Sequence, residues 1–239
     1  MDILWYSLRE IPLSDHLLFP SLVALTSFHL HCLLFTCYDY FVLKREGIPK
    51  MIYDCALPQF VTHLVLNAIS FSVINTRIEL PKRAPKLDEF LFDLSCCYII
   101  GDFFIYWEHV IMHRIPFLRH RIHSTHHKYT SPLHSFNAGW VHPIEIFIAA
   151  VCELCFPLLF NVHPLTLWIF LWTWVFWLVE EHSGDEVWFS LANLIPYVGG
   201  GSRPHALHHA PYLTKNFGFV FSCWDRLFGT YEEPKERKL

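Results

Sequence analysis

Five apolar runs restrict what this chain can fold into. They cover residues 17–42, 57–78, 90–112, 144–160 and 165–179. A helix needs about 20 apolar residues to cross the hydrocarbon core of a bilayer, and the first three runs are long enough for that. We therefore expect an all-α fold, an integral membrane bundle of about four transmembrane helices.

The composition agrees with this fold class. Only 17% of the residues are charged and 53% are hydrophobic, whereas soluble domains carry about 25% charged residues. Disorder is excluded, because it needs low hydrophobicity and high charge. The formal net charge of −4 offers no basic surface, so we expect no nucleic-acid partner.

The last two runs, with 17 and 15 residues, are short for full spans. The turn-like residues 161–164 join them, which predicts a tight helical hairpin. Segments 113–142 and 180–239 carry ten of the eighteen basic residues and should face the cytosol. Whether residues 57–78 cross the membrane stays open. The basic loop 77–86 follows them, and strict alternation would place this loop in the lumen.

Seventeen histidines are the second unusual feature of the chain. One H-x-x-x-H motif closes the third apolar run, and two H-x-x-H-H motifs lie in the polar segments that follow. Residues three or four apart in a helix point the same way, so each motif presents two or three imidazoles on one face. The motif histidines are His109, His113, His123, His126, His127, His205, His208 and His209.

These motifs predict a metal centre. Imidazole suits zinc, copper, iron and nickel, and eight clustered histidines exceed the needs of one four-coordinate site. Two metal ions that share the set are the economical interpretation. No H-E-x-x-H occurs, so a zincin protease is not supported. We interpret seven scattered histidines as ordinary hydrogen-bonding residues, namely His16, His29, His31, His63, His120, His134 and His163.

The position of the motifs indicates the kind of substrate. The first motif ends a membrane helix, so the metals should lie just outside the bilayer, above a cavity between apolar helices. A substrate that reaches them from the membrane would be a lipid. Oxidation of an unactivated C–H bond fits this placement, because it needs a strong metal oxidant, dioxygen and a dry pocket.

The three motifs, in this order over residues 95–231, resemble the signature of the fatty acid hydroxylase/sterol desaturase superfamily of membrane di-iron enzymes. Trp-Val-His-Pro-Ile-Glu at 140–145 and Glu-Glu-His-Ser-Gly at 180–184 resemble segments of its sterol branch, which includes 4-methylsterol oxidases and cholesterol 25-hydroxylases. Trp-Asp-Arg-Leu-Phe-Gly-Thr at 224–230 resembles a further segment of that branch.

The resemblance implies a multi-pass monooxygenase of the endoplasmic reticulum membrane that hydroxylates a sterol with its active site facing the cytosol. It would use two iron ions, which zinc could replace in a purified form, together with dioxygen. Electrons from NAD(P)H would arrive through cytochrome b5 or a reductase. The eight motif histidines would be ligands, His182 a ninth and His142 a tenth. Residues 1–88 would form N-terminal anchor helices and residues 89–239 the catalytic domain.

Several alternatives stay open at this point. The lipid could be a fatty acyl chain or a sphingolipid. From another class, the chain could be a histidine-rich metal transporter, although a transporter should hold its ligands near the middle of its spans. Glu180 and Glu181 either orient ligand imidazoles or end the fifth helix, and Asp225 is expected to brace the C-terminal helix. Which carbon is oxidised depends on the shape of the cavity.

Overall fold

The computed structural model describes residues 1–73, 76–130, 133–184, 187–209 and 214–234. This part of the chain is helical, with two isolated β-bridges and no strand. The predicted all-α class is therefore confirmed for the described residues.

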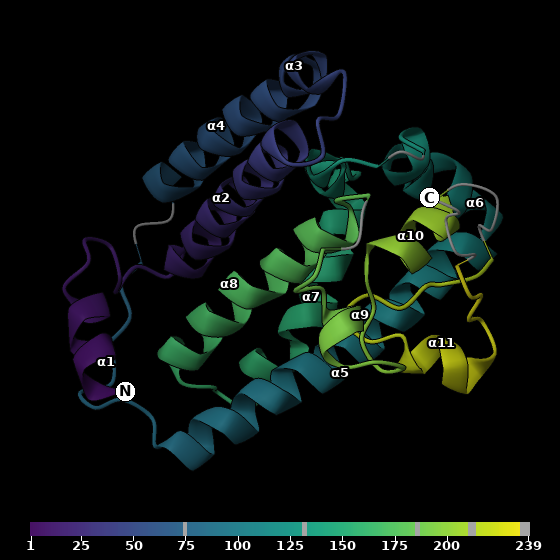
Figure 1. Cartoon of the computed structure of the whole chain (residues 1–239). Helices are drawn as coiled ribbons and strands as arrows, with labels where there is room; N and C mark the ends of the chain where they lie inside the picture. Colours follow the sequence, from purple (N-terminus) through teal and green to yellow (C-terminus); the bar gives the residue numbers. More distant parts are fainter. Residues whose placement is uncertain (74–75, 131–132, 185–186, 210–213, 235–239) are drawn as a thin grey trace.

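Long helices form the body of the molecule, and short elements lie around it (Figure 1). The long helices are α2 (Phe19–Phe41), α4 (Leu57–Val73), α5 (Leu87–Arg114), α7 (Pro143–Leu159) and α8 (Pro164–Glu181). The short elements are α1 (Asp2–Arg9), α3 (Ile48–Met51), η1 (Ile52–Ala56), α6 (Pro116–Arg121), η2 (His123–Lys128), η3 (Ser135–Gly139), α9 (Leu191–Leu194), α10 (Ser202–His209) and α11 (Cys223–Phe228).

Local sequence explains where the last two long helices begin. Pro143 and Pro164 occupy the first turn of α7 and α8, where a backbone N–H would have no partner within the helix. The residue before each proline is a histidine. The Nδ1 atoms of His142 and His163 each accept a hydrogen bond from the backbone N–H two residues further on, at 3.2 and 3.0 Å. Both histidines are therefore helix caps.

The long helices pack in pairs that differ from the predicted ones. α7 packs along α5, and α2 packs along α8, which also contacts α5. Figure 1 shows α4 beside α2 on the outside of the bundle. The prediction that the last two apolar runs form a tight hairpin is wrong, because α7 and α8 each pack mainly on another helix. Side chains of both α7 and α8 line a cavity that is described below.

Buried apolar side chains fill the contacts between these helices. Phe35 of α2 packs in one cluster with Val179 of α8. Phe170 of α8 packs in a second cluster with Cys97 of α5. Burial of one such aromatic side chain contributes about 1.5–3 kcal/mol, so α8 is held firmly on both sides.

The buried carboxyl group of Asp102 on α5 attaches the C-terminal segment to the bundle. It accepts hydrogen bonds from the backbone N–H groups of Val220 at 2.7 Å and Phe221 at 3.1 Å, and from the indole N–H of Trp224 at 2.8 Å. Buried polar groups need such partners. Asp102 thereby fixes the chain between α10 and α11 against the helix that carries the first histidine motif.

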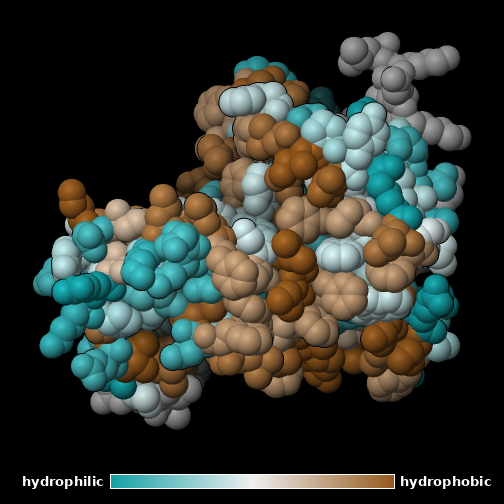
Figure 2. All heavy atoms as spheres, turned by 90° about the horizontal axis from the view of Figure 1, so that it is seen from below, coloured by the Kyte–Doolittle hydropathy of each residue, from teal (hydrophilic) through white to brown (hydrophobic). Residues whose placement is uncertain are grey.

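The helices indicate membrane association. Among the described residues, α2 and α5 are long and apolar enough to cross a membrane, by length and composition. α4 and α7 have 17 residues each, fewer than the roughly 20 that a span needs. Figure 2 shows hydrophobic side chains across the middle of one face of the molecule, and large apolar residues such as Phe147 and Leu159 are exposed. The count of about four spans stays a prediction.

Candidate metal centre

Four stretches of chain bring nine histidines together at one end of the helix bundle. α5 supplies two, η2 three, the residue after α8 one and α10 three. They form two groups, and within each group one nitrogen per residue lies within 4.8 Å of the others. The first group is His109, His113, His123, His127 and His208, and the second is His126, His182, His205 and His209.

The first group has the spacing of ligands around a cation. The Nε2 atoms of His113, His123 and His127 face one another at 2.8, 2.9 and 3.1 Å, and His208 Nε2 lies 3.2 Å from His127 Nε2. Metal–nitrogen bonds of about 2.0–2.1 Å separate neighbouring ligand nitrogens by about 2.9 Å at right angles and about 3.4 Å in a tetrahedron. The observed distances, 2.8–3.2 Å, lie close to the right-angle value and below the tetrahedral one.

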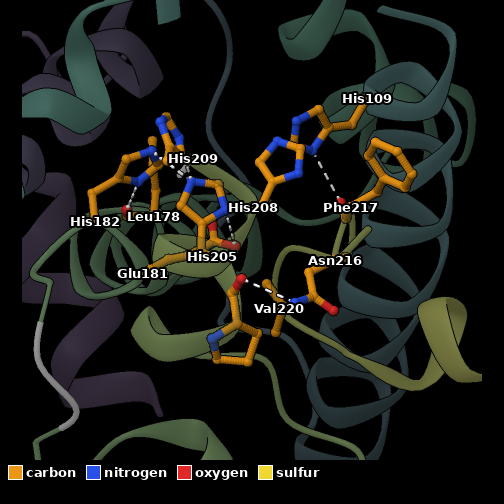
Figure 3. A network of polar contacts seen from close by, with 12 residues as sticks. His109, Leu178, Glu181, His182, His205, His208, His209, Asn216, Phe217 and Val220 are labelled. Atoms are coloured by element: carbon orange, nitrogen blue, oxygen red, sulfur yellow. Dashed lines mark hydrogen bonds and ion pairs between the residues drawn. The ribbon is translucent and has the colours of Figure 1, made fainter. Parts of the chain in front are cut away.

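The second group closes a ring of four nitrogens. His209 Nε2 lies 3.1 Å from His126 Nε2 and 3.0 Å from His205 Nε2. His182 Nε2 completes the ring at 3.0 Å from His205 and 3.4 Å from His126. Figure 3 shows His182, His205 and His209 converging, with His208 and His109 to one side. The second group could therefore hold a metal ion of its own.

Hydrogen bonds on the outer side of the rings make these nitrogens suitable ligands. A neutral imidazole has a single N–H, and a carbonyl oxygen near Nδ1 places it there, so that the Nε2 lone pair points into the group. The Nε2 atom of His109 is buried without a hydrogen-bond partner, as a ligand atom would be. Four Nδ1–carbonyl pairs, at 2.7–3.1 Å, are His109 with Phe217, His182 with Leu178, His208 with Lys215 and His209 with Tyr129.

Two buried carboxyl groups hold a histidine of each group. Glu145 Oε1 lies 2.6 Å from His123 Nδ1, and Glu181 Oε1 lies 2.9 Å from His205 Nδ1. Both alternatives for Glu181 hold, because it is the last residue of α8 and its carboxyl group lies beside an imidazole. Sequence reasoning missed the role of Glu145, although a carboxyl group in the first turn of an apolar helix is itself a signal of a site.

The electrostatic environment keeps the histidines neutral. Burial lowers the pKa of His182 to about 4, and burial together with nearby His182 lowers the pKa of His209 to about 3. Burial, followed by the neighbouring imidazoles, also lowers the pKa of His126, His205 and His208. Only neutral imidazole can bind a metal ion, so the group is ready for ligation at neutral pH.

The structure does not bring His142 to either group, which corrects its assignment as a tenth ligand. Its Nδ1 instead caps α7. The scattered histidines also have ordinary partners. His134 Nε2 lies 3.2 Å from Asp39, and Arg45 joins the same carboxylate at 3.3 Å. His163 caps α8, as the interpretation of these residues as hydrogen-bonding groups predicts.

A cavity of about 290 Å³ adjoins both groups. Its walls come mainly from α5, α7 and α8, with Phe28 of α2 and His63 of α4 at one side. Many of the wall side chains are apolar or small, such as Ala149 and Ala150. A cavity of this kind can hold part of a lipid and keep water away from a metal ion. The histidines that line it are His109, His123, His126, His182 and His205.

The chain is helical and membrane-associated, and its imidazole groups, which could hold metal ions, lie beside an apolar cavity. The sequence profile of the family described as "Fatty acid hydroxylase" matches residues 94–230. The chain therefore belongs to the fatty acid hydroxylase family, and by class it is an oxygen-dependent oxidoreductase. The superfamily predicted from the histidine motifs is confirmed.

Curated relatives match beyond the family segment. Methylsterol monooxygenase 2-2 of Arabidopsis thaliana is 32% identical over 76% of this chain and 68% of its own length. A cholesterol 25-hydroxylase-like protein of Danio rerio is 29% identical over 89% of this chain and 90% of its own length. A very-long-chain aldehyde decarbonylase of Oryza sativa subsp. indica is 29% identical over 83% and 76%. No solved structure matches this chain.

Proposed function

We propose that this chain is a membrane di-iron monooxygenase that hydroxylates a sterol. The observation that carries the proposal is the apolar cavity lined by histidines of both groups. The names of relatives, methylsterol monooxygenase and cholesterol 25-hydroxylase-like protein, support a sterol as the substrate. The nine histidines of the two groups would be the ligands.

Bound iron would supply the oxidising chemistry. In the overall reaction, a C–H bond, dioxygen, two electrons and two protons give an alcohol and one water molecule. The electrons would come from NAD(P)H through cytochrome b5 or a reductase. The chain's own part is positioning: Glu145 and Glu181 orient His123 and His205, and the apolar walls hold the lipid and exclude water.

We further propose that the enzyme resides in the endoplasmic reticulum membrane with the histidine groups on the cytosolic side. Exposed basic residues next to the centre, Arg121 at the end of α6 among them, support this orientation. Residues 1–88 would serve as anchor helices and residues 89–239 as the catalytic domain.

Mass spectrometry of lipid extracts tests the function. Expression in cells that lack such hydroxylases should produce oxygenated sterols, and the His126→Ala variant should not. The His120→Ala variant is the matched control, because His120 is exposed and outside both groups. Hydroxylated acyl chains or sphingolipids in place of oxygenated sterols would overturn the sterol assignment. Metal uptake into vesicles without consumption of dioxygen would instead support a transporter.

A further inference from the structure

A second polar point lies inside the cavity, away from the histidines. Glu153 of α7 and Trp174 of α8 both line the cavity, and both lie beside Gly101 of α5. The nearby wall residues Ile105, Ala150 and Val175 are apolar. A carboxyl group among apolar side chains in a membrane protein is costly unless it has a use.

Three helices place this pair at the same depth below the metal centre. Glu153 follows Glu145, the partner of His123, by eight residues on α7, and Trp174 precedes His182 by eight residues on α8. At 1.5 Å of rise per residue, each separation is about 12 Å along the helix axis. The antiparallel helices α7 and α8 therefore give, independently, the same axial distance between this pair and the metal centre.

The third helix, α5, comes close to the pair at a glycine. Gly101 precedes His109 by eight residues, and a Cβ atom there would lie 3.3 Å from the Glu153 carbonyl oxygen and 3.5 Å from the Trp174 ring. The absence of a side chain lets α5 approach closely at this level. The cavity thus has a defined polar end opposite the histidines.

The chemistry of this polar end selects a hydroxyl group. A carboxyl group accepts a hydrogen bond from a hydroxyl, and when protonated it also donates one. The described residues that line the cavity include no lysine or arginine, so a carboxylate on the ligand would lack a countercharge. A neutral lipid with one hydroxyl group fits better than a free fatty acid.

We infer that Glu153 and Trp174 bind the hydroxyl group of the substrate and so set which carbon reaches the metal centre. This inference rests on the proposed sterol hydroxylation. In a sterol, a methyl group on C-4 is about 3 Å from the hydroxyl oxygen, whereas the end of the side chain is about a dozen bonds of about 1.5 Å away. A separation of about 12 Å or more excludes the C-4 methyl group and selects the side-chain end.

Binding without turnover tests the role of Glu153. We would measure binding of radiolabelled cholesterol and of cholest-5-ene, which lacks the hydroxyl group, to the full chain in lipid nanodiscs without reductant. The Glu153→Leu variant should bind cholesterol about tenfold more weakly and cholest-5-ene as tightly as the unsubstituted chain. The Glu153→Gln variant keeps the side-chain volume and should show a smaller loss for cholesterol alone. The Trp174→Phe variant removes the indole N–H and leaves a smaller ring, and it should weaken binding of cholesterol more than binding of cholest-5-ene. The Glu46→Gln variant exchanges an exposed acid in the same way and should change the affinity for neither ligand.

Regiochemistry gives the second measurement. Given a 4,4-dimethyl sterol, which offers both positions, the enzyme should oxidise the side chain. Oxidation of a C-4 methyl group would overturn the inference. Equal losses of affinity for cholesterol and cholest-5-ene in both Glu153→Leu and Glu153→Gln would also overturn it. If cholesterol binding depends on Glu153 but no sterol is oxidised, the proposed function fails while the assignment of the binding site stands.

Discussion

Glu145 Oε1 lies 2.6 Å from Nδ1 of His123, so an apolar helix and a histidine-rich turn 22 residues apart in sequence are joined at the metal centre. A carboxylate on the outer nitrogen of a ligand histidine fixes the tautomer and the ring orientation and makes the ligand nitrogen more basic. In the second group, Glu181 Oε1 lies 2.9 Å from Nδ1 of His205. Each histidine group therefore has one acidic partner.

The first prediction concerns this acidic partner. The Glu145→Ala variant should bind iron about 10–100-fold more weakly, because His123 loses the group that orients its ring. Iron content after dialysis against graded chelator concentrations measures the loss. The Glu153→Gln variant, two turns further along the same helix, should retain iron. Unchanged iron retention in Glu145→Ala would contradict a role for Glu145 at the centre.

The second prediction tests whether both histidine groups bind metal. His126 belongs to one group and His208 to the other, so alanine at either position should lower the iron content of the purified protein and abolish lipid oxidation. Iron per chain, measured by elemental mass spectrometry, and lipid products should fall together. Alanine at the exposed His120 should affect neither quantity. Full activity in either His126→Ala or His208→Ala would show that the groups are not the metal site.

The third prediction concerns pH. The folded-state pKa values of His182 and His209, about 4 and about 3, lie below the ordinary value of about 6.5. As the pH falls below 6.5, the unfolded chain therefore takes up protons before the folded chain does. The stability contributed by the neutral histidines is present above about pH 6.5 and is lost as the pH falls toward 4.

Metal affinity should also fall as the pH falls, because protons compete with the metal for imidazole nitrogen. Iron content and the thermal unfolding midpoint should both fall between pH 6.5 and 4. A centre that kept all its iron at pH 4.5 after exhaustive dialysis would contradict ligation by these histidines.

The fourth prediction concerns the C-terminal brace. Asp225 accepts hydrogen bonds from the backbone N–H groups of Phe217 at 2.9 Å and Gly218 at 2.6 Å, and from the Thr230 hydroxyl at 2.7 Å. The expected bracing role of Asp225 is thereby confirmed. Because the Phe217 carbonyl holds His109, this brace also supports the metal centre.

The Asp225→Ala variant should lose about 2–4 kcal/mol of stability, since several buried donors lose a charged acceptor. The thermal unfolding midpoint measures this loss, and iron binding should weaken with it. Glu233→Ala, which removes only an exposed partner of Arg226, should change stability by less than about 0.5 kcal/mol. Equal midpoints for the two variants would contradict the bracing role.

Local patterns in the sequence predicted the helices and most of the candidate ligands. The third apolar run, predicted over 90–112, is α5 from Leu87 to Arg114, because apolar length and helix formation are properties of a continuous stretch. The three motifs were recognised for the same reason, since ligand spacing of three or four residues is a local feature. His142 misled the prediction because a histidine before a proline suits a helix cap as well as a ligand.

By itself, then, the sequence predicted the all-α class, the family and ten candidate ligand histidines, of which the structure brings nine together. Only the tertiary structure decided how those histidines divide. Neighbours in the chain, His126 and His127, belong to different groups, as do His208 and His209. Adjacent residues in a helical turn point about 100° apart, and which group each reaches depends on how η2 and α10 pack. The acidic partners and the polar end of the cavity depend likewise on contacts between distant segments, which no local pattern encodes.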